Sequence, residues 1–222
     1  MTDRAVAPDH PLAEAAVEAL GGTPAHVERP PFSPLRPLLP DAVARAVVAF
    51  DAAAERGFDR TLRGRPVADR VFFTASALGD FSLVWHLVGA GKAVVQPSFR
   101  PAARRLAVAL AVESLAVNWG VKSLVRRGRP SGHHVGPHRL RRPRTSSFPS
   151  GHATSGFLAA TLLSEGSRAP LGWYALATVV AASRVHVRIH HASDVVAGAA
   201  MGLGVGRVVR RRRPVPHPPE RA

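Results

Sequence analysis

A chain of 222 residues is long enough for one domain, or for one compact domain with a tail. Its 30 Lys and Arg against 15 Asp and Glu give a formal net charge of +15. This excess favours a polyanionic partner such as nucleic acid, an anionic membrane surface or a phosphorylated substrate. The sequence contains no cysteine, which excludes disulfides and thiolate metal sites.

The first forty residues, 1–40, are rich in proline, alanine and charge, and the prolines between positions 30 and 40 would break any helix. We expect this segment to be disordered. It contains no apolar stretch of signal-peptide length, so membrane insertion is expected to depend on internal segments.

Residues 41–70 begin with apolar residues at helical spacing, among them Val43, Val47, Phe50 and Ala54. Asp41 is of the residue type that caps a helix N-terminus. The pattern predicts an amphipathic helix, which would either pack against the rest of the protein or lie in the plane of a membrane surface.

Apolar blocks follow, with arginines gathered between them, over residues 71–95, 106–121, 151–163, 170–182 and 195–209. Each reaches the roughly 20 residues needed to cross a bilayer when its uncharged flanks are included. We expect an all-α, polytopic membrane helical bundle of about five spans in residues 71–210, followed by a basic, proline-rich tail in residues 211–222. A soluble helical bundle with alanine-rich cores is the alternative.

Two acidic residues interrupt these apolar blocks, Asp80 in the first and Glu113 in the second. A charge inside a membrane is a functional candidate by default. A position at the end of a helix would also explain both residues.

Three polar clusters stand at the edges of the apolar blocks. The first cluster is Lys122 and, after six intervening residues, Arg129-Pro130. The second is Pro149-Ser150-Gly151-His152. The third is Ser183-Arg184, followed after five intervening residues by His190 and after three more by Asp194. Singly, the cations suit interfacial anchors, the serine suits a helix cap, and the last histidine and aspartate suit a structural hydrogen bond. Their joint occurrence favours a catalytic site.

The residue types in these clusters suit the binding and transfer of a phosphate. Arginine offers a planar fork to phosphate oxygens and lysine adds a point charge. Ser150 and Gly151 stand at a predicted helix N-terminus, where N–H groups and the helix dipole favour an anion. Two histidines can divide the labour, because one can attack phosphorus while the other protonates the leaving oxygen. Asp194 follows His190 by four residues, so on a helix the two would share a face.

Together the clusters resemble the tripartite signature of the type 2 phosphatidic-acid phosphatase superfamily, K-x6-RP, PSGH and SR-x5-H-x3-D, at every defined position. The resemblance covers about residues 106–209. It implies that His190 is the nucleophile, that Asp194 orients it, and that His152 is the general acid and later the base. It also implies that no metal ion or other cofactor is needed, and that the phosphate is held by Lys122, Arg129, Ser150, Gly151 and Arg184. Arg188 would add a phosphate contact or narrow the pocket.

The resemblance implies a membrane phosphatase that hydrolyses a lipid phosphomonoester or diphosphate, of the phosphatidate, phosphatidylglycerophosphate or polyprenyl phosphate type, through a phosphohistidine. A lipid phosphotransferase with the same intermediate differs only in its acceptor. A non-enzymatic basic membrane-binding or nucleic-acid-binding protein would not need the two histidines and the aspartate, so we expect no nucleic-acid partner. Apolar blocks argue against a soluble acid phosphatase or a vanadium haloperoxidase.

The expected location is the cell membrane, with several spans. Several arginines stand at the block ends that are remote from the three clusters. The positive-inside rule places these arginines in the cytoplasm, and it therefore places the active site on the extracytoplasmic side. With five spans, an N-terminal segment that stays inside the cell would argue for the opposite orientation.

Overall fold

The computed structural model describes residues 40–132, 136–137, 140–141, 143 and 145–213. Apart from Pro40, the segment predicted to be disordered lies outside the described residues. Of the predicted tail, residues 211–222, Arg211 and Arg212 are instead the last residues of a helix, and residues 214–222 lie outside the described residues. Within the described ranges the chain folds into a helical bundle, and the all-α prediction is confirmed.

Eight α-helices and three short helical segments follow one another along the described chain. The helices are α2 (Asp41–Thr61), α3 (Pro66–Leu78), α4 (Leu83–Val95), α5 (Arg100–Leu115), α6 (Lys122–Leu124), α7 (Gly151–Leu163), α8 (Pro170–His186) and α9 (Ala192–Arg212). The 3₁₀ turns η2 (Asp80–Ser82) and η3 (Pro97–Phe99) flank α4, and the π-helical segment η4 (Ala116–Val121) joins α5 to α6. Asp41 is the first residue of α2 and not its N-cap, which is Pro40.

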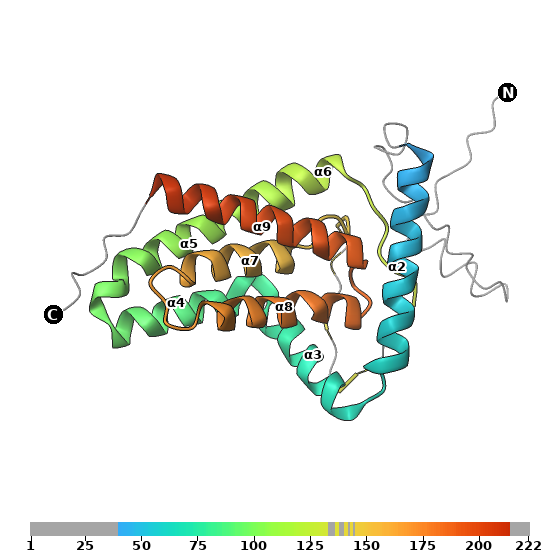
Figure 1. Ribbon diagram of the computed structural model, residues 1–222, viewed down its shortest axis with the longest axis horizontal. Helices are drawn as coiled ribbons and strands as arrows, with labels where there is room; N and C mark the ends of the chain where they lie inside the picture. Colours follow the sequence, from blue (N-terminus) through green and yellow to red (C-terminus); the bar gives the residue numbers. More distant parts are fainter. Residues whose placement is uncertain (1–39, 133–135, 138–139, 142, 144, 214–222) are drawn as a thin grey trace, which may run out of the picture.

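Helix α7 lies at the centre of the bundle, where it contacts α5, α8 and α9 (Figure 1). Its surroundings are apolar, with Trp85, Leu106, Leu110 and Leu158 among the fully buried core residues. Helix α2 crosses the end of the bundle at which α8 ends and α9 begins, and it contacts both of these helices. The predicted helix in residues 41–70 therefore ends at Thr61 and packs against the bundle.

Helices α7 and α9 approach each other closely because α9 presents glycines to α7. A Cβ atom added at Gly198 would lie 2.5 Å from the carbonyl oxygen of Ser150, and one at Gly202 would lie 2.3 Å from that of Thr154. Neither position has room for a side chain. This contact, based on small residues, is of the kind that packs helices together in membranes, and it fixes the start of α9 beside the start of α7.

Two helical segments are long and apolar enough to cross a membrane, Pro97–Leu124 and Ala192–Arg212. A third span is possible by the same criteria if α3 and the segment from Asp80 to Val95, which meet at 67°, form one broken span. The 13 residues of α7 and the 17 of α8 fall short of that length. The structure therefore supports two or three spans by length and composition, and a total of about five stays a prediction.

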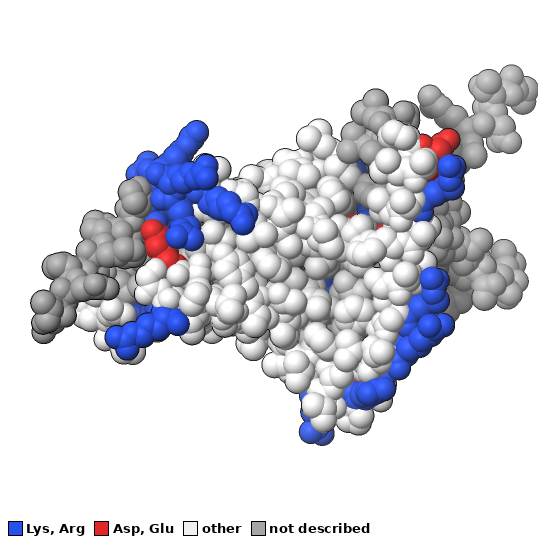
Figure 2. Space-filling model, viewed as in Figure 1, with Lys and Arg blue, Asp and Glu red and all other residues white. Residues whose placement is uncertain are grey.

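The surface agrees with a membrane setting. On the face shown in Figure 2, the middle of the molecule has few charged side chains, and Lys and Arg gather toward its two ends. On α5 and η4, large apolar side chains at helical spacing are mostly exposed: Val108 63%, Val112 60%, Leu115 61% and Trp119 81%. Such a stripe suits contact with lipid.

Candidate active site

The three polar clusters meet at the end of the bundle near α2. Lys122 begins α6, Arg129 lies in the loop that follows, and Arg184 lies in the last turn of α8. A cavity of about 660 Å³ is lined by six of the eight residues singled out in the sequence, Lys122, Arg129, Gly151, His152, Arg184 and His190. The other two, Ser150 and Asp194, are fully buried behind its wall.

His190 lies in the loop between α8 and α9, with 3% of its side chain exposed. Its Nε2 atom is 3.4 Å from Nη1 of Arg129, and its Nδ1 atom is 3.6 Å from Oδ2 of Asp194. Arginine can only donate, so Nε2 carries the lone pair and Nδ1 carries the hydrogen in the neutral ring. Burial lowers the pKa of His190 to about 3, and the nearby Arg129 and Arg184 act in the same direction. The ring is therefore neutral at physiological pH.

Asp194 meets His190 without sharing a helix with it, because α9 begins only at Ala192. The Asp194 side chain turns back at the helix N-terminus, where Oδ2 accepts a hydrogen bond of 2.9 Å from the backbone N–H of His191. This capping bond fixes the carboxylate beside His190. The pair predicted from the spacing is thus brought together by a capping interaction and not by a common helical face.

Arg127 and Asp51 support this carboxylate, and the sequence analysis missed both. Arg127 donates through Nη1 to Oδ1 of Asp194 and through Nη2 to Oδ2 of Asp51 at 2.6 Å. Asp51 also accepts from the backbone N–H and the hydroxyl of Ser193, both at 2.8 Å. The side chains of Arg127 and Asp51 are 3% and 8% exposed. The sequence did contain one sign of this role. Asp51 follows Val47 by four residues and therefore lies on the apolar face of the predicted amphipathic helix, where a charged residue needs a partner.

The N-terminus of α7 and the cations around it form a cradle for an anion. Ser150 is the N-cap, and its hydroxyl accepts from the N–H of Ala153 at 3.5 Å, as its position predicted. A Cβ atom at Gly151 would lie 3.9 Å from Nζ of Lys122, so the lysine reaches the start of the helix. Arg184 is 1% exposed and donates to the hydroxyl of Ser76. Charge, helix dipole and N–H groups all favour an anion here.

His152 faces the break between α3 and α4. Its Nε2 atom lies 3.1 Å from the carbonyl oxygen of Ser76 and 3.3 Å from Oδ1 of Asp80. Both oxygens stabilise a hydrogen on this nitrogen. The break leaves no room for a side chain at Gly79, where a Cβ atom would lie 2.5 Å from Cδ2 of His152. Asp80, one of the two acidic residues inside the apolar blocks, is therefore a partner of the second histidine.

Arg188 turns away from the cavity toward α2, although it stands two residues before His190. Its Nη2 atom donates to both carboxylate oxygens of Asp59, at 2.9 and 3.0 Å. Arg63 binds the same helix and donates to the carbonyl oxygens of Val185 and His186 at 2.6 and 2.8 Å. These bonds connect α2 to the segment that leads to His190. Arg188 is not among the residues that line the cavity, so its expected roles, a phosphate contact or a narrowing of the pocket, stay predictions.

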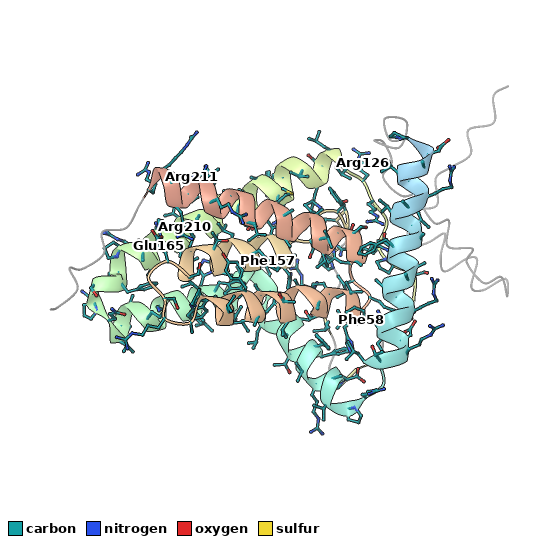
Figure 3. The ribbon with its side chains drawn as sticks, viewed as in Figure 1. Phe58, Arg126, Phe157, Glu165, Arg210 and Arg211 are labelled. Atoms are coloured by element: carbon teal, nitrogen blue, oxygen red, sulfur yellow. The ribbon has the colours of Figure 1, made fainter. Side chains whose placement is uncertain are left out.

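Figure 3 shows which labelled residues lie toward each of the two ends of the molecule. Phe58 of α2 and Arg126, which follows α6, lie toward the end that carries the cavity, whereas Glu165, Arg210 and Arg211 lie toward the opposite end. The cavity lined by the residues singled out in the sequence therefore lies at one end of the bundle.

Known proteins that are similar to this chain agree with the resemblance found in the sequence motifs. The family model described as the PAP2 superfamily matches residues 102–215. The decaprenylphosphoryl-5-phosphoribose phosphatase of Mycobacterium tuberculosis is 40% identical over 89 residues, which are 40% of this chain and 49% of that protein. The phosphatase of the same name from Mycolicibacterium smegmatis is 34% identical over 138 residues, which are 62% of this chain and 74% of that protein. The chain therefore spans about half the length of the M. tuberculosis relative.

Among solved structures, a transmembrane PAP2-type phosphatidylglycerolphosphate phosphatase from Bacillus subtilis has a similar fold, with a TM-score of 0.58. The match covers 79% of this chain and 88% of that one, at 22% sequence identity. At this identity the similarity concerns the fold alone.

Proposed function

Since the chain belongs to the PAP2 superfamily, we propose that it is a membrane phosphatase that hydrolyses lipid phosphates through a phosphohistidine. The observation that carries the proposal is the setting of His190. A neutral imidazole with its lone pair on Nε2 lies between Arg129 and Asp194 in a cavity lined by further cations. This is the arrangement that a nitrogen nucleophile for phosphorus needs.

In the first step, Nε2 of His190 forms a bond to phosphorus while the bond from phosphorus to the leaving oxygen breaks and its electron pair stays on that oxygen. Lys122, Arg129 and Arg184 neutralise the charge on the remaining phosphate oxygens. Burial lowers the pKa of His152 to about 4, and the nearby Asp80 opposes this shift. A phosphate dianion bound in the cavity would favour the protonated ring further. The protonated His152 donates its proton to the leaving oxygen, so a neutral alcohol departs, or a lipid monophosphate if the substrate is a diphosphate. Asp194 stabilises the positive charge that develops on the His190 ring.

In the second step, water attacks the phosphohistidine. His152, now neutral, takes a proton from the water as its oxygen bonds to phosphorus. The bond between phosphorus and Nε2 breaks, its electron pair returns to the His190 ring, and inorganic phosphate leaves. The scheme uses only groups of this chain and requires no metal ion.

A lipid substrate is supported by the mouth of the cavity. Two exposed aromatic side chains line it, Phe81 at 80% exposure and Trp119 at 81%, and Trp119 belongs to the exposed apolar stripe of α5 and η4. A phosphate bound among the cations could therefore carry its hydrocarbon part out toward lipid. The name of the two mycobacterial relatives, which refers to a lipid-linked phosphate, agrees with this substrate class.

We place the active site on the extracytoplasmic side of the cell membrane. Both ends of the molecule carry Lys and Arg. The support is that Arg210, Arg211 and Arg212 directly end a candidate span at the end opposite the cavity. The chain contains no cysteine, so single cysteines can report the orientation in intact cells. A membrane-impermeant maleimide should label Arg126→Cys and leave Arg213→Cys unlabelled, and the reverse pattern would overturn this orientation.

The test of the function is phosphate release by the full chain, purified in detergent, from a panel of lipid phosphates in the presence of EDTA. Wild type should release phosphate, and His190→Ala should lose about a thousandfold or more of the activity. His86→Ala is the matched control, because His86 is an exposed histidine on α4. Activity that survives in His190→Ala, or that EDTA abolishes, would refute the mechanism. Transfer of phosphate to an added alcohol with no release would indicate a phosphotransferase.

A further inference from the structure

Glu113 is a buried acidic residue in the cavity that the reaction scheme does not use. It lies within the candidate span Pro97–Leu124, is 5% exposed and lines the same cavity as the two catalytic histidines. Within the described ranges its Oε1 atom has no hydrogen-bond partner. A buried carboxyl oxygen without a partner is unfavourable, and such groups in a native structure call for an explanation such as a ligand.

The π-helical segment η4 accounts for the direction in which Glu113 points. In an uninterrupted α-helix, the nine residues from Glu113 to Lys122 would turn the chain by about two and a half turns and place the two side chains on opposite sides. The wider turn of Ala116–Val121 lies between them. Both side chains line the cavity as a result. Segments of this kind occur frequently at functional sites.

A chain of hydrogen bonds along the same helical segment extends from the phosphate cradle to a hydroxyl group. Nζ of Lys122 donates to Oδ1 of Asn118 at 2.9 Å, and Nδ2 of Asn118 donates to Oγ of Ser114 at 3.2 Å. Ser114 lines the cavity beside Glu113. Its hydroxyl therefore accepts from Asn118 and keeps its own hydrogen for a further acceptor. The wall thus offers an acceptor on Glu113 and a donor on Ser114, next to the cation that binds phosphate.

We propose that Glu113 and Ser114 form a subsite for a hydroxyl group on the head group of the substrate, next to its phosphate. A hydroxyl can donate to the Glu113 carboxyl and accept from the Ser114 hydroxyl at once. The substrate class is then a lipid whose phosphate is carried by a polyol, such as a glycerol or sugar unit with a free hydroxyl. This inference rests on the proposed function and narrows it.

The charges in the cavity favour a neutral hydroxyl over an amine in this subsite. Four cationic side chains line the cavity: Lys122, Arg129, Arg141 and Arg184. Among the described lining residues, the acidic side chains are only Asp80 and Glu113. Asp80 already faces His152. A head group with an ammonium would bring a further positive charge into a site with an excess of cations, whereas a hydroxyl adds none.

The test compares phosphatidylglycerophosphate, which has a free hydroxyl beside the phosphorylated carbon, with an analogue in which propanediol replaces that glycerol. Wild type should prefer the hydroxylated substrate by about 10- to 100-fold in kcat/KM, as expected when the analogue leaves a buried polar group without a hydrogen-bond partner. In Glu113→Gln the ratio should fall to within about twofold. Glu165→Gln is the matched control, because Glu165 pairs with Arg105 at the opposite end of the molecule, and it should keep the wild-type ratio.

Equal kcat/KM values of wild type for the two substrates would overturn the subsite. A ratio that persists in Glu113→Gln would overturn it too, and so would an equal loss on both substrates, which would mean that Glu113 acts only through Lys122. If Glu113→Gln does not fold, Ser114→Ala at its exposed position should lower the ratio instead, and an unchanged ratio there would count against the proposal. Failure of wild type to hydrolyse any lipid phosphate would instead refute the proposed function.

Discussion

Replacing Asp51 by alanine should destabilise the protein and slow catalysis, although Asp51 lies on α2, far from the catalytic clusters in the sequence. Asp51 accepts hydrogen bonds from Arg127 at 2.6 Å and from the N–H and hydroxyl of Ser193 at 2.8 Å. Removing one partner of a buried ion pair costs about 3–5 kcal/mol. Because Asp194 still faces Arg127, we expect a loss near the lower end, about 3 kcal/mol.

The effect on activity follows from the same contacts. Arg127 holds the Asp194 carboxylate, and a small displacement of that carboxylate would misalign the His190 ring. We expect kcat to fall by about ten- to a hundredfold and KM to change much less, because the phosphate cradle is made by other residues.

The measurements are chemical unfolding in detergent and steady-state hydrolysis. Asp59→Ala is the control on the same helix, since Asp59 also pairs with arginines but has 44% of its side chain exposed. Its loss should stay below about 1 kcal/mol. If the two variants lose the same free energy of unfolding, or if Asp51→Ala loses less than about 1 kcal/mol, the reasoning about the buried network is wrong.

Three further predictions concern packing and protonation. Gly202→Ala should lower the free energy of unfolding by about 1–3 kcal/mol through overpacking. The control Gly204→Ala, with nothing within 4 Å of the added Cβ, should be neutral or stabilising by up to about 1 kcal/mol. Equal effects of the two substitutions in denaturant unfolding would contradict this prediction. Gly79→Ala should lower kcat by displacing the His152 ring, 2.5 Å from the added Cβ, and an unchanged kcat would refute the contact. The NMR signal of the His190 ring should show no titration between pH 5 and 8, because its pKa is about 3. Since the unfolded chain takes up this proton near pH 6.5, stability should fall as the pH drops from 6.5 toward 3. A titration step near 6.5 in the folded protein would show that the ring is not desolvated.

The residues that we propose carry the chemistry were identified from local spacing and from the resemblance of three short motifs to one family. The Ser150 cap forms as its position before an apolar block predicted, and six of the eight residues line one cavity. The gathering of the six residues in one cavity depends on how the helices pack. The Ser150 cap depends on neighbours within about one helical turn, so the sequence determines it whatever the path of the chain. The apolar blocks likewise determined that the fold is all-α.

The support of the site depends on contacts between distant parts of the chain, and only the tertiary structure decided it. Arg127 and Asp51 are 76 positions apart, and Arg63 and His186 are 123 apart. No spacing rule relates such pairs, because they meet only once α2 has crossed the end of the bundle. The direction of Glu113 depended on the π-helical turn of η4, which composition does not reveal. The sequence thus indicated the groups that we propose carry the chemistry, and the packing decided which groups hold them and which others line the cavity.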